Sequence, residues 1–494
     1  ILYASGSGSS NYTSIKVYPT AANVSITGNM DLPLIDLNGA DNVTIDGRIN
    51  GNNSITSNDL TFVNQSTSSL PDISTIRFTN SAENNVLRYL NIKGATANAS
   101  GFSANVYFST SASGNGNDNN TIDHCNLTGI SATSRPLTVI STSGGISTIF
   151  DNGNTISNNS IYDYFSNSST SSKGGVFLSG YSTNFKILNN SFYETLTLVP
   201  SITNVKYYGV YVQSSAYNVY HTIQGNYFGG TAPQAGGSAM TFTPTSNIGY
   251  QVLPIYVNSL ASTNPNSIQG NTIKNFKLNN NISTGNPFVG ISVVAGLANI
   301  GTITGNTIGS TTGSGSIMVT DYYNSTNGSV VGIYATSAYA LNIFNNSVGS
   351  ISTDGANITG IYVGNGYGNT NVSNNLIGSI DEGTSSSLIL LNPTILVTKS
   401  LSGISVFGQG INTINNNTIS KLSVNIASGN NALIGIYGYY GSYLITNNTI
   451  RDLTNLSTNN SQSNYGFSYG NPVNSENAPA ISGIYIQPTT ANSL

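Results

Sequence analysis

The chain has 494 residues, of which only 6% are charged, and its 14 Lys and Arg against 18 Asp and Glu give a net charge of −4. So few basic residues exclude a nucleic-acid-binding surface, because such a surface needs a basic stripe to neutralise phosphates. Without a run of about 18 apolar residues, we expect no membrane span in this segment. The single cysteine, Cys125, excludes an intrachain disulfide framework, and we expect it to be buried.

In chain order, residues 1–60 contain short alternating strands at 14–18, 24–26, 34–37 and 43–45, which we interpret as two leading coils. Residues 61–150 hold degenerate repeats and a Gly/Asn/Ser-rich loop around 114–120, and residues 151–494 hold regular repeats. No charge run or Pro-rich linker interrupts the chain, so we expect a single domain over residues 1–494. It stops in mid-repeat, and we expect it to be a segment of a longer polypeptide.

A six-residue motif dominates the sequence. It reads INNNTI at 414–419, ITNNTI at 445–450, ITGNTI at 303–308 and ISNNSI at 156–161, and it recurs in looser form upstream to LRYLNI at 87–92. Spacings of about 29 to 45 residues indicate an array of one structural unit. The fourth position is Asn in nine consecutive copies: Asn159, Asn190, Asn226, Asn271, Asn306, Asn346, Asn375, Asn417 and Asn448.

The motif has a simple physical interpretation. Its apolar ends suit two short strands, and its Asn and Gly residues tolerate the left-handed backbone of a sharp bend between them. If coils stack at about 4.8 Å, the nine Asn side chains lie above one another and can hydrogen-bond as an internal ladder.

A second motif, G-I-x-V, precedes the end of each Asn motif by about 15 to 19 residues, as in GVYV at 209–212 and GIYV at 360–363. Strands that repeat in this way pair in parallel with their equivalents in neighbouring coils, and parallel crossovers are right-handed in about 98% of cases. The two motifs therefore predict an all-β fold, a right-handed parallel β-helix of roughly 13 to 14 coils.

Both motifs resemble the parallel β-helix repeat of the pectate-lyase-like superfamily, in which an Asn ladder is common. The stretches NVTIDGRINGNNS, STIRFTNSAENN, GNGNDNNTID and GNTISNNSIYDY resemble, more narrowly, large secreted or surface proteins of the Bacteroidota. The resemblance implies a secreted or cell-surface location and export through the type IX secretion system, although the C-terminal sorting domain of those proteins is absent from this sequence.

An enzyme on this fold would need a cluster of carboxylates. A lyase would use them to bind calcium beside an Arg or Lys base, and a hydrolase would use two or three of them as catalytic groups. Asp163 and Glu194 stand alone in the repeat region, and we expect them to be solvated loop residues. Charged residues gather near the start, where Lys16, Asp36 and Arg77 are expected to point outward on one face and could form a weak site. The two histidines, His124 and His221, are too few to form a hydrolase triad or a metal site. We therefore predict no catalytic residue, metal or cofactor.

The position between the Ile and Val of G-I-x-V should point outward, because alternate residues of a strand face opposite sides. In register, this position would form an outward aromatic stripe open to glycans or to a partner chain. An equally weighted interpretation is that Tyr simply favours strands. The stripe comprises Tyr107, Phe177, Tyr211, Tyr256, Tyr334, Tyr362, Tyr437 and Tyr485.

The function that these features favour is a non-catalytic extracellular cell-surface protein, an adhesin or stalk. It would present a Tyr-rich face to an extracellular glycan or to a neighbouring surface or secretion-system protein. The alternative is a carbohydrate-active enzyme, a polysaccharide lyase or glycoside hydrolase, or its binding remnant. Sequons such as the one at Asn158 arise from the bend motif itself and carry little weight for glycosylation.

Overall fold

The computed structural model describes residues 1–494 except 9, 112–113, 166–173, 247, 280–284, 311–312, 321–327, 355, 365, 367, 379–387, 391–399, 426–431, 456–480 and 488–494. The described residues form short strands and two 3₁₀ turns, η1 (Ile49–Gly51) and η2 (Pro233–Ala235). None of the helices in these ranges is long and apolar enough to cross a membrane.

The chain divides into two compact units. Unit 1 comprises residues 1–196, 207–237 and 255–267, and unit 2 comprises residues 197–206, 238–254 and 268–494. Three strands, β21 (Val205–Tyr217), β25 (Tyr250–Leu260) and β26 (Asn266–Gln269), contribute residues to both units. The expectation of a single domain stays a prediction.

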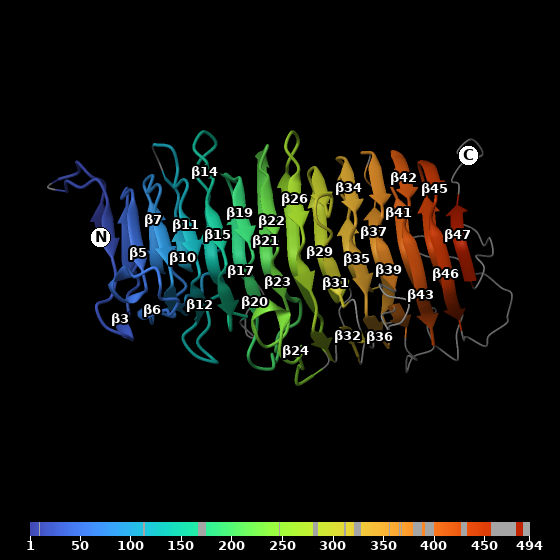
Figure 1. Ribbon diagram of the computed structural model, residues 1–494, viewed down its shortest axis with the longest axis horizontal. Coiled ribbons are helices and arrows are strands. Elements are labelled where there is room, and N and C mark those ends of the chain that lie inside the picture. Colours follow the sequence, from blue (N-terminus) through green and yellow to red (C-terminus); the bar gives the residue numbers. More distant parts are fainter. Residues whose placement is uncertain are drawn as a thin grey trace. The chain divides into compact units, whose positions relative to one another are not determined.

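One coil of unit 1 shows how the repeat folds. Strand β15 (Thr155–Ser157) ends at a bend formed by Asn158 and Asn159, strand β16 (Ser160–Tyr162) follows, and β17 (Gly174–Ser179) is the next long strand. Asn158 has a φ of 55°, the left-handed conformation that Asn tolerates. Equivalent strands of successive coils pair in parallel (Figure 1), so the predicted right-handed parallel β-helix is confirmed.

Three parallel sheets result. The first sheet carries the G-I-x-V strands, the second ends at the Asn bend, and the third begins after it. In unit 1 the first sheet has the order β1 (Leu2–Tyr3), β4 (Ile35–Asn38), β7 (Ser74–Thr79), β10 (Ala104–Phe108), β13 (Thr138–Thr142), β17 and β21 (Val205–Tyr217). The second has β2 (Ile15–Val17), β5 (Val43–Asp46), β8 (Val86–Arg88), β11 (Thr121–Asp123), β15, β19 (Phe185–Leu188) and β22 (His221–Gln224). The third has β3 (Val24–Gly28), β6 (Leu60–Asn64), β9 (Leu90–Gly94), β12 (Asn126–Gly129), β16, β20 (Ser191–Tyr193) and β23 (Tyr227–Phe228), and a small sheet pairs β14 (Asp151–Asn152) with β18 (Ser182–Thr183).

Unit 2 repeats the same arrangement. Its first sheet has β29 (Phe288–Ala295), β33 (Ser329–Ala335), β37 (Asn357–Gly364), β41 (Ser400–Phe407), β44 (Ala432–Tyr439) and β47 (Ile481–Gln487). The second has β30 (Ala298–Ile300), β34 (Leu341–Phe344), β38 (Thr370–Ser373), β42 (Ile411–Asn415) and β45 (Ser442–Thr446). The third has β27 (Thr272–Ile273), β31 (Thr307–Gly309), β35 (Ser347–Gly349), β39 (Leu376–Gly378), β43 (Thr418–Val424) and β46 (Thr449–Asn455), accompanied by β24 (Met240–Phe242), β28 (Phe276–Leu278), β32 (Ile317–Val319), β36 (Ile351–Thr353) and β40 (Leu388–Leu390).

The glycine that opens G-I-x-V is required by close packing across the coil. A Cβ added to Gly332 would lie 2.5 Å from Cγ1 of Val348 and 2.6 Å from the carbonyl oxygen of Gly360. Real Cβ atoms do not come so close to other atoms, so a side chain here would push the first sheet away from the third. The next residue, Ile333, is fully buried in the core between the sheets.

The nine Asn side chains of the repeat lie at the bend between the second and third sheets and form ladders within each unit. In unit 1 the Nδ2 of Asn159 donates to Oδ1 of Asn190 at 2.9 Å, and Asn190 donates to Asn226 at 3.0 Å. In unit 2 the ladder runs through Asn271, Asn306, Asn346, Asn375, Asn417 and Asn448 at 2.8 to 3.0 Å. Within each unit these amides therefore join successive coils from inside the core.

Unit 1 contains a second Asn ladder, at the entry to the second sheet, that we did not predict. The Nδ2 of Asn85 donates to Oδ1 of Asn120 at 2.9 Å, and Asn120 donates in turn to Asn154 at 3.1 Å. The Oδ1 of Asn85 also accepts the backbone N–H of Val43. These three residues precede the second-sheet strands β8, β11 and β15, so the early coils that lack the Asn of the bend motif are joined by amides at a different corner.

Candidate functional site

The outer face of the first sheet carries the aromatic residues that the sequence singles out. In unit 1, strand pairing places one row in register: Arg77, Tyr107, Ser141, Phe177 and Tyr211, and the Tyr256 ring contacts Tyr211 at 5.2 Å. In unit 2 the row runs through Ser292, Tyr334, Tyr362, Ser405, Tyr437 and Tyr485. The structure thus brings the predicted stripe residues of each unit together.

Several of these rings stack on one another through their faces. Tyr334 stacks on Tyr362 with centroids 5.0 Å apart and planes 5° apart, and Tyr437 stacks on Tyr485 at 5.6 Å and 6°. Phe407 fills the gap at Ser405, since its ring lies 5.3 Å from that of Tyr362 and 5.2 Å from that of Tyr437. A ring whose face contacts the next ring presents mainly its edge and hydroxyl group outward, so face-on stacking with a sugar is restricted.

The expectation of an open stripe is wrong for half of its residues. Tyr107, Phe177, Tyr211 and Tyr437 have only 2%, 4%, 9% and 2% of their surface exposed, whereas Tyr256, Tyr334, Tyr362 and Tyr485 are half-buried. In unit 1 the backbone of Gly101 covers the row: a Cβ there would lie 2.5 Å from the Phe177 ring. Burial raises the pKa of both Tyr107 and Tyr211 to about 12. Much of the row is an outer packing layer.

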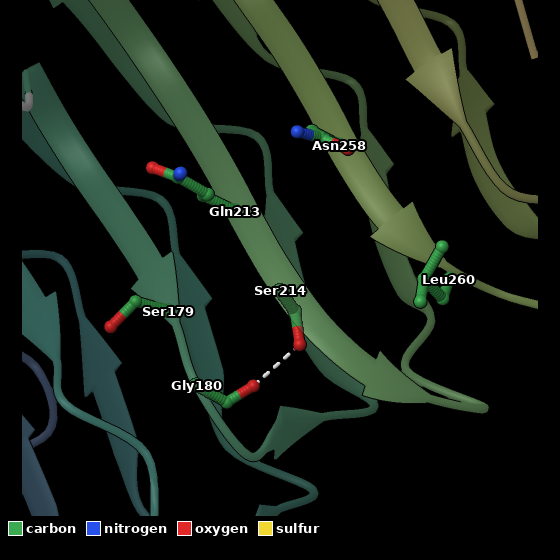
Figure 2. Close-up of a pocket in the computed structure, with 6 residues that line it drawn as sticks. All are labelled: Ser179, Gly180, Gln213, Ser214, Asn258 and Leu260. Carbon is green, nitrogen blue, oxygen red and sulfur yellow. Dashed lines mark hydrogen bonds between the residues drawn. The ribbon is translucent and has the colours of Figure 1, made fainter.

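An open groove lies beside the aromatic row of unit 1 (Figure 2). It has a volume of about 360 Å³ and is lined by Ser179, Gly180, Gln213, Ser214, Asn258 and Leu260, at the carboxyl-terminal ends of β17, β21 and β25. Ser179 pairs in register with Gln213, which follows Tyr211 by two residues and therefore points to the same side of the sheet. Figure 2 shows the side chains of Gln213 and Asn258 projecting from adjacent strands, with the Asn258 amide nitrogen turned toward β21.

The hydrogen bonds of the groove leave its two amides largely available. The Tyr211 hydroxyl donates to Oε1 of Gln213, so the Gln213 Nε2 faces away from Tyr211. Ser214 donates to the carbonyl of Gly180, a bond drawn in Figure 2. Within the described ranges, the Gln213 Nε2 and the whole Asn258 side-chain amide have no protein hydrogen-bond partner. They can therefore bind a ligand at the cost of displacing water alone.

Some of the charged residues near the start form ion pairs. Arg77 binds Asp36 through two parallel contacts of 2.9 Å, and Asp36 is 5% exposed. Lys16 does not join them, because β2 belongs to the second sheet and the Lys16 Nζ donates to the carbonyl of Gly51. The predicted weak site of Lys16, Asp36 and Arg77 is therefore not assembled.

Asp46 is held in the same way. It is fully buried and contacts Arg48 at 2.8 Å and Arg88 at 2.9 Å. Burial alone would raise the pKa of Asp46, but hydrogen bonds from Arg48 and the charge of Arg88 lower it below its usual range. The Arg48 guanidinium also lies 4.4 Å from the centre of the Tyr89 ring, which stacks on His124 at 4.8 Å. A carboxylate held ionised by two arginines cannot serve as a general acid.

Glu194 corrects another expectation. We expected a solvated loop residue, yet Glu194 is fully buried, its Oε2 is bonded to Arg135, and its Oε1 accepts the backbone N–H groups of Tyr164 and Phe165. Burial raises the pKa of Glu194 to about 7, against the opposing effect of the Arg135 charge. Asp163 lies 3.7 Å from Arg135 and is partly exposed. This cluster is enclosed and fixes the chain where it turns out of the third sheet.

Metal and thiol chemistry find little support in the part of the chain that the structure describes. There, no group of three His, Cys, Asp or Glu residues is placed to hold a metal ion. Cys125 is 1% exposed, and its backbone N–H donates to Oδ1 of Asn159, so it heads the ladder of unit 1. Burial raises the pKa of the Cys125 thiol to about 12, which keeps it protonated and unreactive at neutral pH.

Comparison with models of protein families and with curated proteins finds no match for this chain. The functional conclusion therefore depends on the geometry of the outer face and its groove. Sequence reasoning missed the groove although a signal was present: Gln213 and Asn258 each follow an aromatic residue of the predicted row by two positions, in YVQ and YVN. Extending the strand alternation by one step would have placed both amides outward.

Proposed function

We propose that this protein is a non-catalytic extracellular cell-surface protein, an adhesin or stalk-like β-helix. It binds an extracellular glycan or a neighbouring surface protein through the outer face of its first sheet. The architecture supports this, because a solenoid gains length by adding coils and each coil repeats the same surface. The low charge of the sequence also fits a partner that is recognised without strong electrostatics.

The single observation that carries the proposal is the groove beside the aromatic row of unit 1. Its six lining residues are uncharged, and two of them, Gln213 and Asn258, offer available amides. Binding sites for small ligands are concave and combine apolar surface with a few polar groups that fix the ligand's orientation. Leu260 and the half-buried Tyr256 supply apolar surface in the same region.

No specific observation favours the alternative, a carbohydrate-active enzyme. Glycoside hydrolysis needs two carboxyl groups, one on each side of the scissile bond, and one of them must be able to give a proton. The lining of the groove contains no carboxylate. Near the start of the chain, Asp36 and Asp46 are each bound by arginine. The resemblance to secreted Bacteroidota proteins supports export through the type IX secretion system as part of the proposal.

Two experiments test the proposal. An antibody against this chain should label intact cells of the source organism, and the purified protein should bind glycans or surface proteins from that organism. Incubation with pectin, alginate or mannan should release neither reducing ends nor unsaturated products. Turnover of any of these polymers that disappears in Asp36→Ala or Arg77→Ala would favour the enzyme instead, and absence of labelling on intact cells would contradict a surface location.

A further inference from the structure

We infer that the groove at the ends of β17, β21 and β25 is a binding site for an uncharged glycan, with Gln213 and Asn258 as its hydrogen-bonding residues. This inference rests on the proposed function, since it names the ligand class and the site of that binding face.

The polar groups match hydroxyl groups. The Gln213 Nε2 can donate, and the Asn258 amide can both donate and accept. A sugar hydroxyl is both a donor and an acceptor, so it can pair with either group. The Ser179 hydroxyl donates to the carbonyl of Thr142 at 2.6 Å, which leaves its oxygen able to accept a further bond from a ligand.

The charge and size of the groove select among ligands. With no cation or anion among the lining residues, a uronate or phosphate group would lose water without gaining a counter-charge. The volume of about 360 Å³ is near the lower end of the range of roughly 300 to 1,000 Å³ for small-molecule sites. One or two sugar units of a neutral glycan fit this description, with Leu260 against a C–H face of the ring.

The groove is held in place before any ligand binds. Gln213 and Asn258 stand on strands, the Tyr211 hydroxyl fixes the Gln213 amide, and Ser214 ties β21 to Gly180. Gly180 has a φ of 60°, so the turn that closes this end of the groove suits glycine. Groups that are already ordered lose less entropy when they bind, which favours specific recognition.

The test compares neutral and acidic oligosaccharides. An array of cello-, manno-, xylo- and galacto-oligosaccharides, with oligogalacturonate and oligoalginate as acidic counterparts, is probed with the whole chain. The strongest ligand is then titrated calorimetrically against Gln213→Ala, Asn258→Ala and the double variant. Gln224→Ala is the matched control, because Gln224 is an exposed glutamine on β22 of the second sheet, outside the groove.

We expect binding of a neutral oligosaccharide only, weakened about 3- to 10-fold by each single variant and further by the double variant, as loss of one direct hydrogen bond predicts. Gln224→Ala should bind like the parent, and all variants should keep the parent's melting temperature because both amides are outside the core. Equal binding by the double variant, or preference for the acidic set, would overturn the groove as the site while leaving the proposed function standing. Failure of the parent protein to bind any glycan would overturn this inference and leave a neighbouring surface protein as the partner in the proposed function.

Discussion

The internal ladder offers the sharpest test of what holds the coils together, and Asn306 lies in the middle of it in unit 2. Its Nδ2 donates to the carbonyl of Ile268 at 2.9 Å and to Oδ1 of Asn346 at 2.8 Å. Its Oδ1 accepts both the backbone N–H and the Nδ2 of Asn271, each at 2.9 Å. Asn306→Leu removes all four bonds from a site with no exposed surface.

Four bonds at about 1 kcal/mol net each, with an additional penalty of about 1 to 3 kcal/mol for the buried N–H of Asn271 that loses this acceptor, predict a destabilisation of about 5 to 7 kcal/mol. Solenoids do not always unfold in one step, so a site-resolved measurement is preferable to a single midpoint. Hydrogen exchange measured by NMR or mass spectrometry should show a loss of protection of at least about 100-fold at the Asn271 amide, because about 2.7 kcal/mol corresponds to that factor.

Asn342→Leu provides the control. Asn342 lies on β34 of the second sheet, is half-buried, and its side chain makes one ladder-like bond, to Oδ1 of Asn299 at 2.8 Å. The same change of side chain should therefore cost less than about 1 kcal/mol there. If Asn306→Leu and Asn342→Leu show equal exchange at Asn271, the ladder bonds do not stabilise the stack and the reasoning is refuted.

Three further predictions follow from buried groups. Burial raises the pKa of Asp151 to about 7, so the contribution of this carboxyl group to stability is full below about pH 4 and is lost as the pH rises to 7. Over that window, the free energy of unfolding of Asp151→Asn, measured in urea, should rise relative to that of the parent by up to about 1.4 kcal/mol per pH unit. A difference in free energy that does not change with pH would contradict this. Burial lowers the pKa of His221 to about 3, so stability is lost as the pH falls from about 6.5 toward 3. The His221→Leu variant should therefore unfold at a lower pH than the parent. Acid unfolding at the same pH in both proteins would argue against a buried neutral imidazole. Tyr437→Ser should destabilise the protein by about 3 kcal/mol or more, because Tyr437 is buried and packs with Phe407. Tyr334→Ser should cost much less, because Tyr334 is half-buried. Calorimetric melting of the two variants tests this ranking.

The sequence alone determined the coil. Three features recur along the regular repeat: isoleucine at the ends of the bend motif, glycine at the start of G-I-x-V, and asparagine at a fixed position. Each of these residues contacts its own coil or the equivalent position of the next coil, so the repeated sequence pattern is enough to predict these contacts. The ladder through Asn271 and Asn306 could be predicted for that reason, as could the register of Tyr334 with Tyr362. Strand alternation also decided which residues face away from the core.

The alternation of side chains along a strand does not show which segment covers an outward-pointing residue. Only the tertiary structure decided which outward side chains are covered. Phe177 is covered because Gly101, 76 positions earlier in the sequence, folds over the row, and Glu194 is buried because Arg135 reaches it from another coil. Loops of variable sequence make these contacts, and no periodicity encodes their path. The groove at Gln213 and Asn258 stays open for the same physical reason. Two adjacent strands carry its amides, and its openness depends on which loops leave that end of the sheet uncovered.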